Sequence, residues 1–153
     1  MKDFPIALSI IIPALNEEGA ISSSVKTVEK VVDQLGISYE LILVDDGSTD
    51  RTGAIMDDLA KVDPGRVRVM HNQKPRNIGG AFWQGTQVAR GEYVTFVPGD
   101  NEAPFQGLVD IFKKINFADL ITSYVINTDI RSFYRRFISG SYVFILNTLF
   151  RLN

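Results

Sequence analysis

The sequence contains no cysteine and a single histidine, His71. The absence of cysteine excludes disulfides, zinc–thiolate sites, iron–sulfur clusters and thiol catalysis, and one histidine cannot form a histidine-rich metal site. No apolar run approaches the roughly 18 residues that a membrane-spanning helix needs, since the longest is Tyr142–Leu146. The first residues also lack the basic region and the cleavage site of a signal peptide. We therefore expect a cytoplasmic chain.

The remaining composition is that of one globular domain with an uneven charge. The chain has 153 residues, of which 45% are hydrophobic and 22% charged, enough to bury a sizeable core. The net charge of −2 does not indicate a basic surface for binding nucleic acid. Residues 1–130 carry all 18 acidic residues, whereas residues 131–153 carry four arginines and no acid. This asymmetry predicts that the C-terminal end meets an anionic or apolar surface.

Short apolar runs alternate with stretches of helical periodicity along most of the chain. The first run is interrupted by Pro13, which we expect to end the strand, while Asn16 is placed to cap the following helix and Gly36 to end it. This alternation predicts parallel βαβ units, and so an α/β fold with a doubly wound sheet and helices on both faces. The expected strands are residues 7–12, 40–44, 67–70, 92–97 and 120–124, and the later helices 52–62, 78–89 and 105–116.

Ligands of such sheets bind at the carboxyl ends of the strands, where this sequence places several polar groups. Asp45 and Asp46 directly follow the second predicted strand. Adjacent carboxylates repel each other unless a cation or hydrogen-bond donors compensate their charge. A carboxylate at this position can accept hydrogen bonds from a nucleobase or a ribose. Alternatively, the segment is a turn and a helix cap. That alternative accounts for residues 47–50 but not for the two aspartates.

A second acidic group follows the fourth predicted strand. Asp100 and Glu102 are two residues apart, so in a turn both can reach one hard cation through oxygen. A nucleoside diphosphate can sit beside carboxylates only if a divalent ion bridges them, and Mg²⁺ or Mn²⁺ is the expected ion. The alternative is an exposed acidic loop around the Pro98–Gly99 turn.

Two further strand ends carry weaker signals. The segment Asn77–Gly80 puts glycines at a helix N-terminus, which suits a phosphate, with Lys74 and Arg76 nearby. It is neither a dinucleotide fingerprint nor a Walker loop. Alternatively, the glycines allow close packing of the helix on the sheet, and the two cationic side chains are simply solvated. The segment Asn16–Glu18, an asparagine followed by two acidic residues, is typical of a helix N-terminus and needs no ligand to explain it.

Taken together, these motifs resemble the opening of family 2 glycosyltransferases. The resemblance covers residues 7–104, and it is greatest to the dolichol-phosphate (polyprenyl-phosphate) mannosyltransferase branch. The segments that carry it are Ile10–Glu18, Glu40–Asp50, Asn77–Gly80 and Ala89–Val94.

The resemblance implies a GT-A fold, which is a Rossmann-like nucleotide-sugar-binding sandwich with a mostly parallel sheet flanked by helices. It also implies a divalent cation and inversion at the anomeric carbon. Carried over by position, it implies that the base and ribose are cradled by Pro13, Leu15 and Glu17, that the base is read by Val44 and Asp46, and that the metal and diphosphate are met by Gly99, Asp100 and Glu102. Asp100 is then the catalytic residue, and Asp100 and Glu102 are the metal ligands.

The sequence departs from the family pattern in three places. Pro98 stands where the first aspartate of an Asp-x-Asp motif is expected. The family also has an arginine for the diphosphate near residues 124–127, which this sequence lacks, and Arg131 is a candidate to replace it. Family members also continue well past Asn153. We therefore expect residues 1–129 to be the nucleotide-sugar-binding core. Residues 130–153 are expected to be an amphipathic acceptor-side or membrane-proximal helix of a domain that is incomplete at its C-terminus.

The partners expected from the resemblance are a GDP- or UDP-sugar donor and a dolichyl or undecaprenyl phosphate acceptor. Residues 130–152 interleave arginine with aromatic residues, which suits the cytoplasmic face of a membrane. The same pattern suits packing against another part of the fold or a partner chain. The oligomeric state, the sugar and the base are left open.

Three other functions are compatible with parts of the pattern. A family 2 enzyme with a polysaccharide or glycan acceptor shares the donor site. A signalling receiver domain also places acidic residues at strand ends, but it needs a lysine after the last strand, and none follows Lys114. The third alternative is a non-catalytic nucleotide-binding module.

Overall fold

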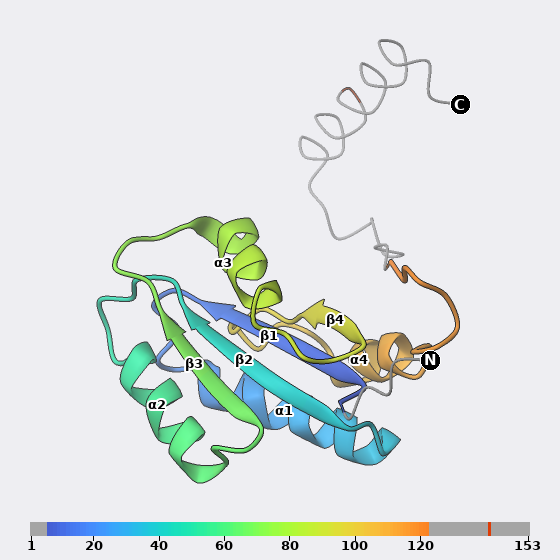
Figure 1. Cartoon of the computed structure of the whole chain (residues 1–153). Helices are drawn as coiled ribbons and strands as arrows, with labels where there is room; N and C mark the ends of the chain where they lie inside the picture. Colours follow the sequence, from blue (N-terminus) through green and yellow to red (C-terminus); the bar gives the residue numbers. More distant parts are fainter. Residues whose placement is uncertain (1–5, 123–140, 142–153) are drawn as a thin grey trace. The chain divides into compact units, whose positions relative to one another are not determined.

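The computed structural model describes residues 6–122 and Ser141 (Figure 1). The chain divides into two compact units, Met1–Asp119 and Leu120–Asn153, and the elements below belong to the first. The domain boundary predicted at residue 129 and the predicted helix over residues 130–153 lie outside the described residues, apart from Ser141, so both stay predictions.

Strands and helices alternate strictly in the described part of the chain. The elements are β1 (Leu8–Ala14), α1 (Ile21–Leu35), β2 (Tyr39–Asp45), α2 (Thr52–Val62), β3 (Val67–His71), α3 (Asn77–Thr86), β4 (Tyr93–Phe96) and α4 (Phe105–Phe112). The strands are parallel and lie in the order β3-β2-β1-β4. The predicted parallel α/β architecture is therefore confirmed, and β1 and β2 occupy the centre of the sheet.

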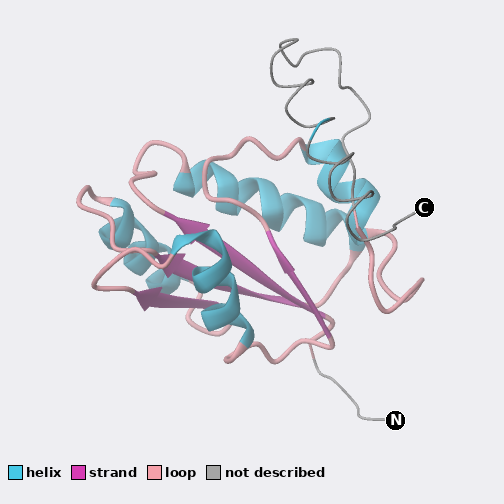
Figure 2. Ribbon diagram, turned by 90° about the horizontal axis from the view of Figure 1, so that it is seen from above, coloured by secondary structure: helices cyan, strands magenta, loops and turns pink. Residues whose placement is uncertain are grey.

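Helices cover both faces of the sheet, as predicted (Figures 1 and 2). Successive side chains of a strand point to opposite faces. Ile10 and Ile12 accordingly join the core cluster that includes residues of α1, α2 and α4, whereas Ile11 joins a smaller cluster with Ala81 of α3. All three isoleucines are fully buried. Burial on both faces explains why the strand reads as an apolar run rather than as an alternating pattern.

The first strand and the first helix differ from the sequence prediction. β1 continues through Pro13 to Ala14, because the proline carbonyl still accepts a hydrogen bond from the Gly99 N–H (3.0 Å). α1 begins only at Ile21, and Asn16 does not cap it, since its φ of 57° is left-handed. The predicted end of α1 is confirmed, because Gly36 adopts a φ of 64° after the last turn.

The third and fourth helices end earlier than their periodicity predicts, whereas α2 has the predicted bounds. α3 ends at Thr86, whose hydroxyl donates to the carbonyl of Trp83 (2.7 Å) and so competes with the backbone hydrogen bonds. α4 ends at Phe112, and Asn116 has a left-handed φ of 71° that a continuing helix excludes. Of the strand predicted at residues 120–124, residues 120–122 form no strand, and the rest lies outside the described residues.

Candidate functional site

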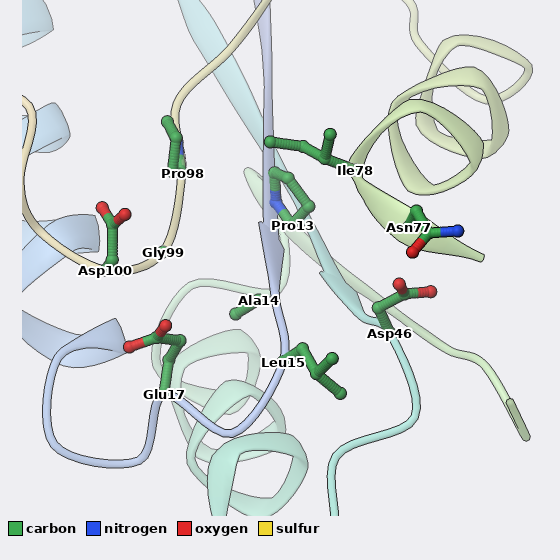
Figure 3. Close-up of a pocket in the computed structure, with 10 residues that line it drawn as sticks. All are labelled: Pro13, Ala14, Leu15, Glu17, Asp46, Asn77, Ile78, Pro98, Gly99 and Asp100. Carbon is green, nitrogen blue, oxygen red and sulfur yellow. The ribbon is translucent and has the colours of Figure 1, made fainter. Parts of the chain in front are cut away.

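A pocket of about 280 Å³ opens at the carboxyl ends of β1, β2 and β4 (Figure 3). This is the edge of the sheet at which parallel α/β folds bind their ligands. Ten residues line it: Pro13, Ala14, Leu15, Glu17, Asp46, Asn77, Ile78, Pro98, Gly99 and Asp100. The pocket therefore collects the ends of four segments that are far apart in the sequence.

The pocket has an acidic group on each of two sides. Asp46, at the end of β2, lies on one side, while Asp100 and Glu17 lie on the other, with Pro13 and Leu15 between them (Figure 3). Carboxylates in the wall of a pocket are stabilised by hydrogen-bond donors and by cations. The arrangement thus favours a ligand that brings both donors and a cation.

Two of the predicted site residues do not line the pocket. The side chain of Val44 is fully buried and belongs to the core cluster beneath α3, so it cannot touch a ligand. Glu102 is exposed beside the pocket, and its backbone N–H donates to Asp100 Oδ1 (3.0 Å). The other predicted residues, Pro13, Leu15, Glu17, Asp46, Gly99 and Asp100, are brought together.

Asp46 is held rigidly by one of its two carboxylate oxygens. Its Oδ1 accepts hydrogen bonds from Asn72 Nδ2 (2.9 Å) and from the Arg76 backbone N–H (2.8 Å). Its own N–H donates to the Ala14 carbonyl (2.9 Å). Within residues 6–122, Oδ2 takes no hydrogen bond, although the residue is only 4% exposed and lines the pocket. One acceptor is therefore presented to the pocket in a fixed orientation.

Asp45, by contrast, is a structural residue. Its Oδ1 accepts from the Ser48 backbone N–H (2.9 Å), and its Oδ2 lies 3.0 Å from His71 Nδ1. Burial alone raises the pKa of the Asp45 carboxyl, but the hydrogen bonds from Ser48 and His71 outweigh it and hold that pKa below its ordinary value. Of the two adjacent aspartates, only Asp46 lines the pocket.

The loop after β1 is tied to the loop after β2 by hydrogen bonds between side chains and backbone. Asn16 Oδ1 accepts from the Thr49 N–H (2.8 Å), and the Asn16 N–H donates to Ser48 Oγ (3.0 Å). The Glu17 N–H donates to Thr52 Oγ1 (2.8 Å). Asp50 accepts from the Thr52 N–H (2.9 Å) at the start of α2, in line with the turn-and-cap alternative, whereas Ser48 and Thr49 contact Asn16 in the first loop.

Gly99 allows β1 and the segment after β4 to approach closely. Its N–H donates to the Pro13 carbonyl (3.0 Å). A Cβ at this position would lie 2.7 Å from the Ala14 Cβ, which is closer than real Cβ atoms approach. Glycine is therefore required here for packing, at the base of the loop that presents Asp100.

We predict that Gly99→Ala lowers the free energy of unfolding by about 1–3 kcal/mol, because the added methyl overpacks the contact with Ala14. Gly79→Ala is the matched control, since a Cβ there meets nothing within 4 Å and lies in α3. The control is expected to be neutral or to stabilise by up to about 1 kcal/mol. Urea unfolding followed by circular dichroism checks both, and equal stabilities of the two variants would contradict the packing argument.

Sequence analysis missed a buried carboxylate at the start of β2. Glu40 is fully buried, and its Oε1 accepts from Ser9 Oγ (2.7 Å) and from the Arg90 backbone N–H (2.6 Å). Its Oε2 accepts from Arg68 Nη2 (2.7 Å) and from Arg90 Nε (2.9 Å). The network joins β1, β2, β3 and the turn before β4. A glutamate within an apolar strand was the available signal, because a buried charge needs such partners.

The acidic groups of the pocket suit a cation that a ligand helps to hold. Within the part of the chain that the structure describes, no group of three or more histidine, aspartate or glutamate side chains is placed to hold a metal ion. Mg²⁺ at nucleotide sites is usually held by one or two carboxylates together with phosphate oxygens and water. Asp100, an oxygen donor in the pocket wall, fits that requirement.

The parallel sheet with an acidic pocket at its carboxyl edge is the α/β architecture expected of the GT-A fold. The structure is similar to that of S. aureus TarS, residues 1–349, with a TM-score of 0.57 and 24% identity over 73% of this chain and 33% of that one. It is also similar to the mannosyltransferase PcManGT from Pyrobaculum calidifontis, solved with GDP-Man and Mn²⁺, with a TM-score of 0.53 and 22% identity over 65% and 31% of the two chains.

Residues 9–151 match the family described as glycosyl transferase family 2, so the chain belongs to that family of glycosyltransferases. It is 30% identical over 161 residues to the dolichyl-phosphate beta-glucosyltransferase of Dictyostelium discoideum, and this alignment covers 94% of this chain and 49% of that protein. It is 31% identical over 105 residues to the undecaprenyl-phosphate 4-deoxy-4-formamido-L-arabinose transferase of Pseudomonas aeruginosa, covering 68% and 31%.

The chain thus spans between about a third and a half of the length of these relatives. Family membership confirms the resemblance found in the sequence and excludes the receiver-domain alternative. Among the described residues, no helix combines the length and the apolar character that crossing a membrane requires.

Proposed function

We propose that the pocket binds a nucleotide sugar together with Mg²⁺ or Mn²⁺, and that the protein transfers the sugar to a polyprenyl phosphate with inversion. The observation that supports this most is that Asp46 and Asp100, 54 positions apart in the sequence, line one pocket on opposite sides of Pro13 and Leu15. A UDP- or GDP-sugar has a base with an N–H donor at one end, a diphosphate in the middle and the sugar at the other end.

The base and ribose are assigned to the side of Asp46. Its carboxylate is fixed by Asn72 and by the backbone of Arg76, and its free Oδ2 can accept a hydrogen bond from a base N–H. Pro13 and Leu15 supply apolar contact between the two sides of the pocket. Glu17, on the side of Asp100, would accept a hydrogen bond from a ribose hydroxyl where the ribose meets the diphosphate. Val44 contributes to this site only by holding the end of β2, because its side chain is buried.

The diphosphate and the metal are assigned to the side of Asp100. Asp100 is the proposed catalytic residue and a metal ligand, and Glu102 is the second proposed ligand, exposed two residues further on. The cation, when bound, would neutralise charge on the departing diphosphate. Gly99 lets the loop lie against β1, and the Glu102 N–H fixes Asp100 through Oδ1, so Oδ2 is left for a ligand.

The acceptor is proposed from the chemistry and from the relatives. Two of those relatives are named for dolichyl-phosphate and undecaprenyl-phosphate transfer. A phosphate oxygen is already anionic and needs no strong base. It attacks the anomeric carbon from the side opposite the leaving group, the bond to the diphosphate breaks, and the nucleoside diphosphate departs with the electron pair. Such an acceptor is held in a membrane, and we propose that the protein acts at the cytoplasmic face.

Calorimetric titration of the intact chain with UDP and GDP, with and without Mn²⁺, tests the donor site. We predict binding of one nucleotide that Mn²⁺ strengthens and that Asp100→Asn weakens by about tenfold or more, in line with the loss of a charged ligand. Glu92→Gln is the matched control, since Glu92 is an exposed acid just before β4, at its other end. Absence of binding, or equal loss in both variants, would contradict the proposal.

The acceptor is tested separately by transfer assays. Radiolabelled UDP-glucose and GDP-mannose are offered with undecaprenyl phosphate, dolichyl phosphate or a free oligosaccharide. Label that moves into the lipid fraction supports the polyprenyl-phosphate acceptor, whereas label in the oligosaccharide would assign a glycan acceptor instead.

A further inference from the structure

His71, the last residue of β3, contacts a carboxylate with each of its ring nitrogens. Nδ1 lies 3.0 Å from Asp45 Oδ2, and Nε2 lies 3.0 Å from Asp57 Oδ1. A neutral imidazole has one N–H, so one contact would set a nitrogen lone pair against a carboxylate, whereas the imidazolium donates in both directions. The hydrogen bond to Asp45, with a smaller contribution from Asp57, raises the pKa of His71 above its ordinary value despite partial burial.

Asp45, the buried partner of His71, packs closely against the start of α2. Asp45 is 7% exposed at the end of β2. A Cβ on Gly53, in the first turn of α2, would lie 2.6 Å from Asp45 Oδ2 and 3.2 Å from the His71 ring. Position 53 therefore has no room for a larger side chain beside the pair. The His71 side chain itself is 45% exposed.

Asp45 connects this pair to the pocket through consecutive hydrogen bonds. Its Oδ1 accepts from the Ser48 N–H (2.9 Å), and Ser48 Oγ accepts from the Asn16 N–H (3.0 Å). Asn16 stands between Leu15 and Glu17, which both line the pocket. The orientation of the imidazole is thereby linked to the backbone of the pocket loop.

We propose that His71 is a positioning residue for the pocket: in its doubly protonated form it fixes Asp45, and through Ser48 and Asn16 it holds Leu15 and Glu17 in place. The charged groups that face the ring in the described structure are Asp45 from β2 and Asp57 from α2. Loss of the ring proton removes a donor from one of these carboxylates. The loop then loosens, and the ligand of the pocket binds more weakly. The identity of that ligand rests on the proposed function.

The test uses the fact that His71 is the only histidine, so its ring signals need no assignment by mutation. Nuclear magnetic resonance of the intact, isotope-labelled chain follows the ring and the backbone amides of Leu15, Asn16 and Glu17 from pH 5.5 to 9. We expect an imidazolium at pH 6.5, and amide shifts of the loop that change with the same midpoint as the ring.

Asp57→Asn removes one facing carboxylate and leaves the hydrogen bonds of Asp45 in place. It should lower the midpoint of the ring and of the loop amides together. Asp58→Asn is the matched control, because Asp58 is the next residue on α2, is exposed, and pairs with Lys61. The control should leave both midpoints unchanged. Loop amides that do not follow the ring, or a ring midpoint unmoved by Asp57→Asn in a chain with a native spectrum, would overturn the proposal.

Binding is measured in parallel with UDP-glucose and GDP-mannose plus Mg²⁺, whose diphosphates do not titrate in this range. We expect affinity to fall several-fold between pH 6.5 and pH 8.5, and Asp57→Asn to shift this fall to lower pH. Affinity that is independent of pH would overturn the proposal. If the loop follows the ring but neither nucleotide sugar binds at any pH, the positioning role of His71 stands and the proposed function fails.

Discussion

Glu40→Ala is expected to lower the free energy of unfolding by about 3 kcal/mol, the scale for removing one partner of a buried charged network. The substitution leaves the Ser9 hydroxyl and the Arg90 N–H without their acceptor, and it removes the carboxylate that pairs with the Arg68 guanidinium, which keeps its hydrogen bond to the Val88 carbonyl. Glu92→Ala removes an exposed glutamate and should change stability by less than about 0.5 kcal/mol. Urea unfolding of the intact chain at pH 7 measures both.

Glu40→Gln separates the charge from the shape and adds a pH dependence. Burial alone raises the pKa of Glu40, but the hydrogen bonds from Ser9 and Arg90 and the charge of Arg68 outweigh it and lower that pKa. A lowered pKa stabilises the fold above the unfolded value and loses that contribution as pH falls through the folded value. The stability difference between wild type and Glu40→Gln should therefore shrink below about pH 4.5. A difference that is constant down to pH 3 would show that the charge contributes nothing.

Asp46→Asn is expected to weaken nucleotide binding by about 10- to 100-fold, the range for losing a hydrogen bond to a charged acceptor. Asparagine keeps one oxygen to accept from Asn72 and Arg76, so the loop after β3 is retained while the oxygen that faces the pocket becomes a donor. Asp33→Asn makes the same chemical change on α1, away from the pocket lining. It should leave the affinity unchanged.

Calorimetry with UDP and GDP measures these affinities, and the unfolding free energy shows whether each variant is folded. Weakening of both nucleotides to the same degree would indicate that Asp46 contacts a group that they share, such as the ribose. Weakening of one nucleotide alone identifies the base that the site reads. Unchanged affinity for both in Asp46→Asn would remove Asp46 from the site.

The order and type of the elements followed from the sequence because burial leaves a clear pattern. β1 and β2 are buried on both faces and read as apolar runs, and α2 has the predicted bounds, Thr52–Val62. The predicted element boundaries are wrong where contacts with distant parts of the chain determine the local conformation. Pro13 stays in its strand because Gly99 donates to its carbonyl. Asn16 leaves the helix because Ser48 and Thr49 from a distant loop satisfy it.

The candidate site was predictable as far as residue type and strand ends determine it. Asp46, Asp100, Leu15 and Glu17 converge because parallel strands end at one edge of the sheet. The different tasks of the adjacent aspartates could not be predicted, because they depend on the location of His71, 26 residues further along the chain than Asp45. Likewise, the burial of Val44 depends on the position of α3 above the sheet.

The central claim is that the pocket holds a nucleoside diphosphate through a cation at Asp100. It is tested most directly by the paramagnetic effect of Mn²⁺ on the amide signals of the isotope-labelled chain with UDP-glucose or GDP-mannose. The account predicts strong broadening at Gly99, Asp100 and Glu102 that requires the nucleotide sugar and disappears with chelator. The amides of Gly36 and Gly65, in the loops that enter β2 and β3, should stay sharp. Broadening that is centred on other residues would contradict the central claim. Broadening that is equally strong with and without the nucleotide sugar would also contradict it.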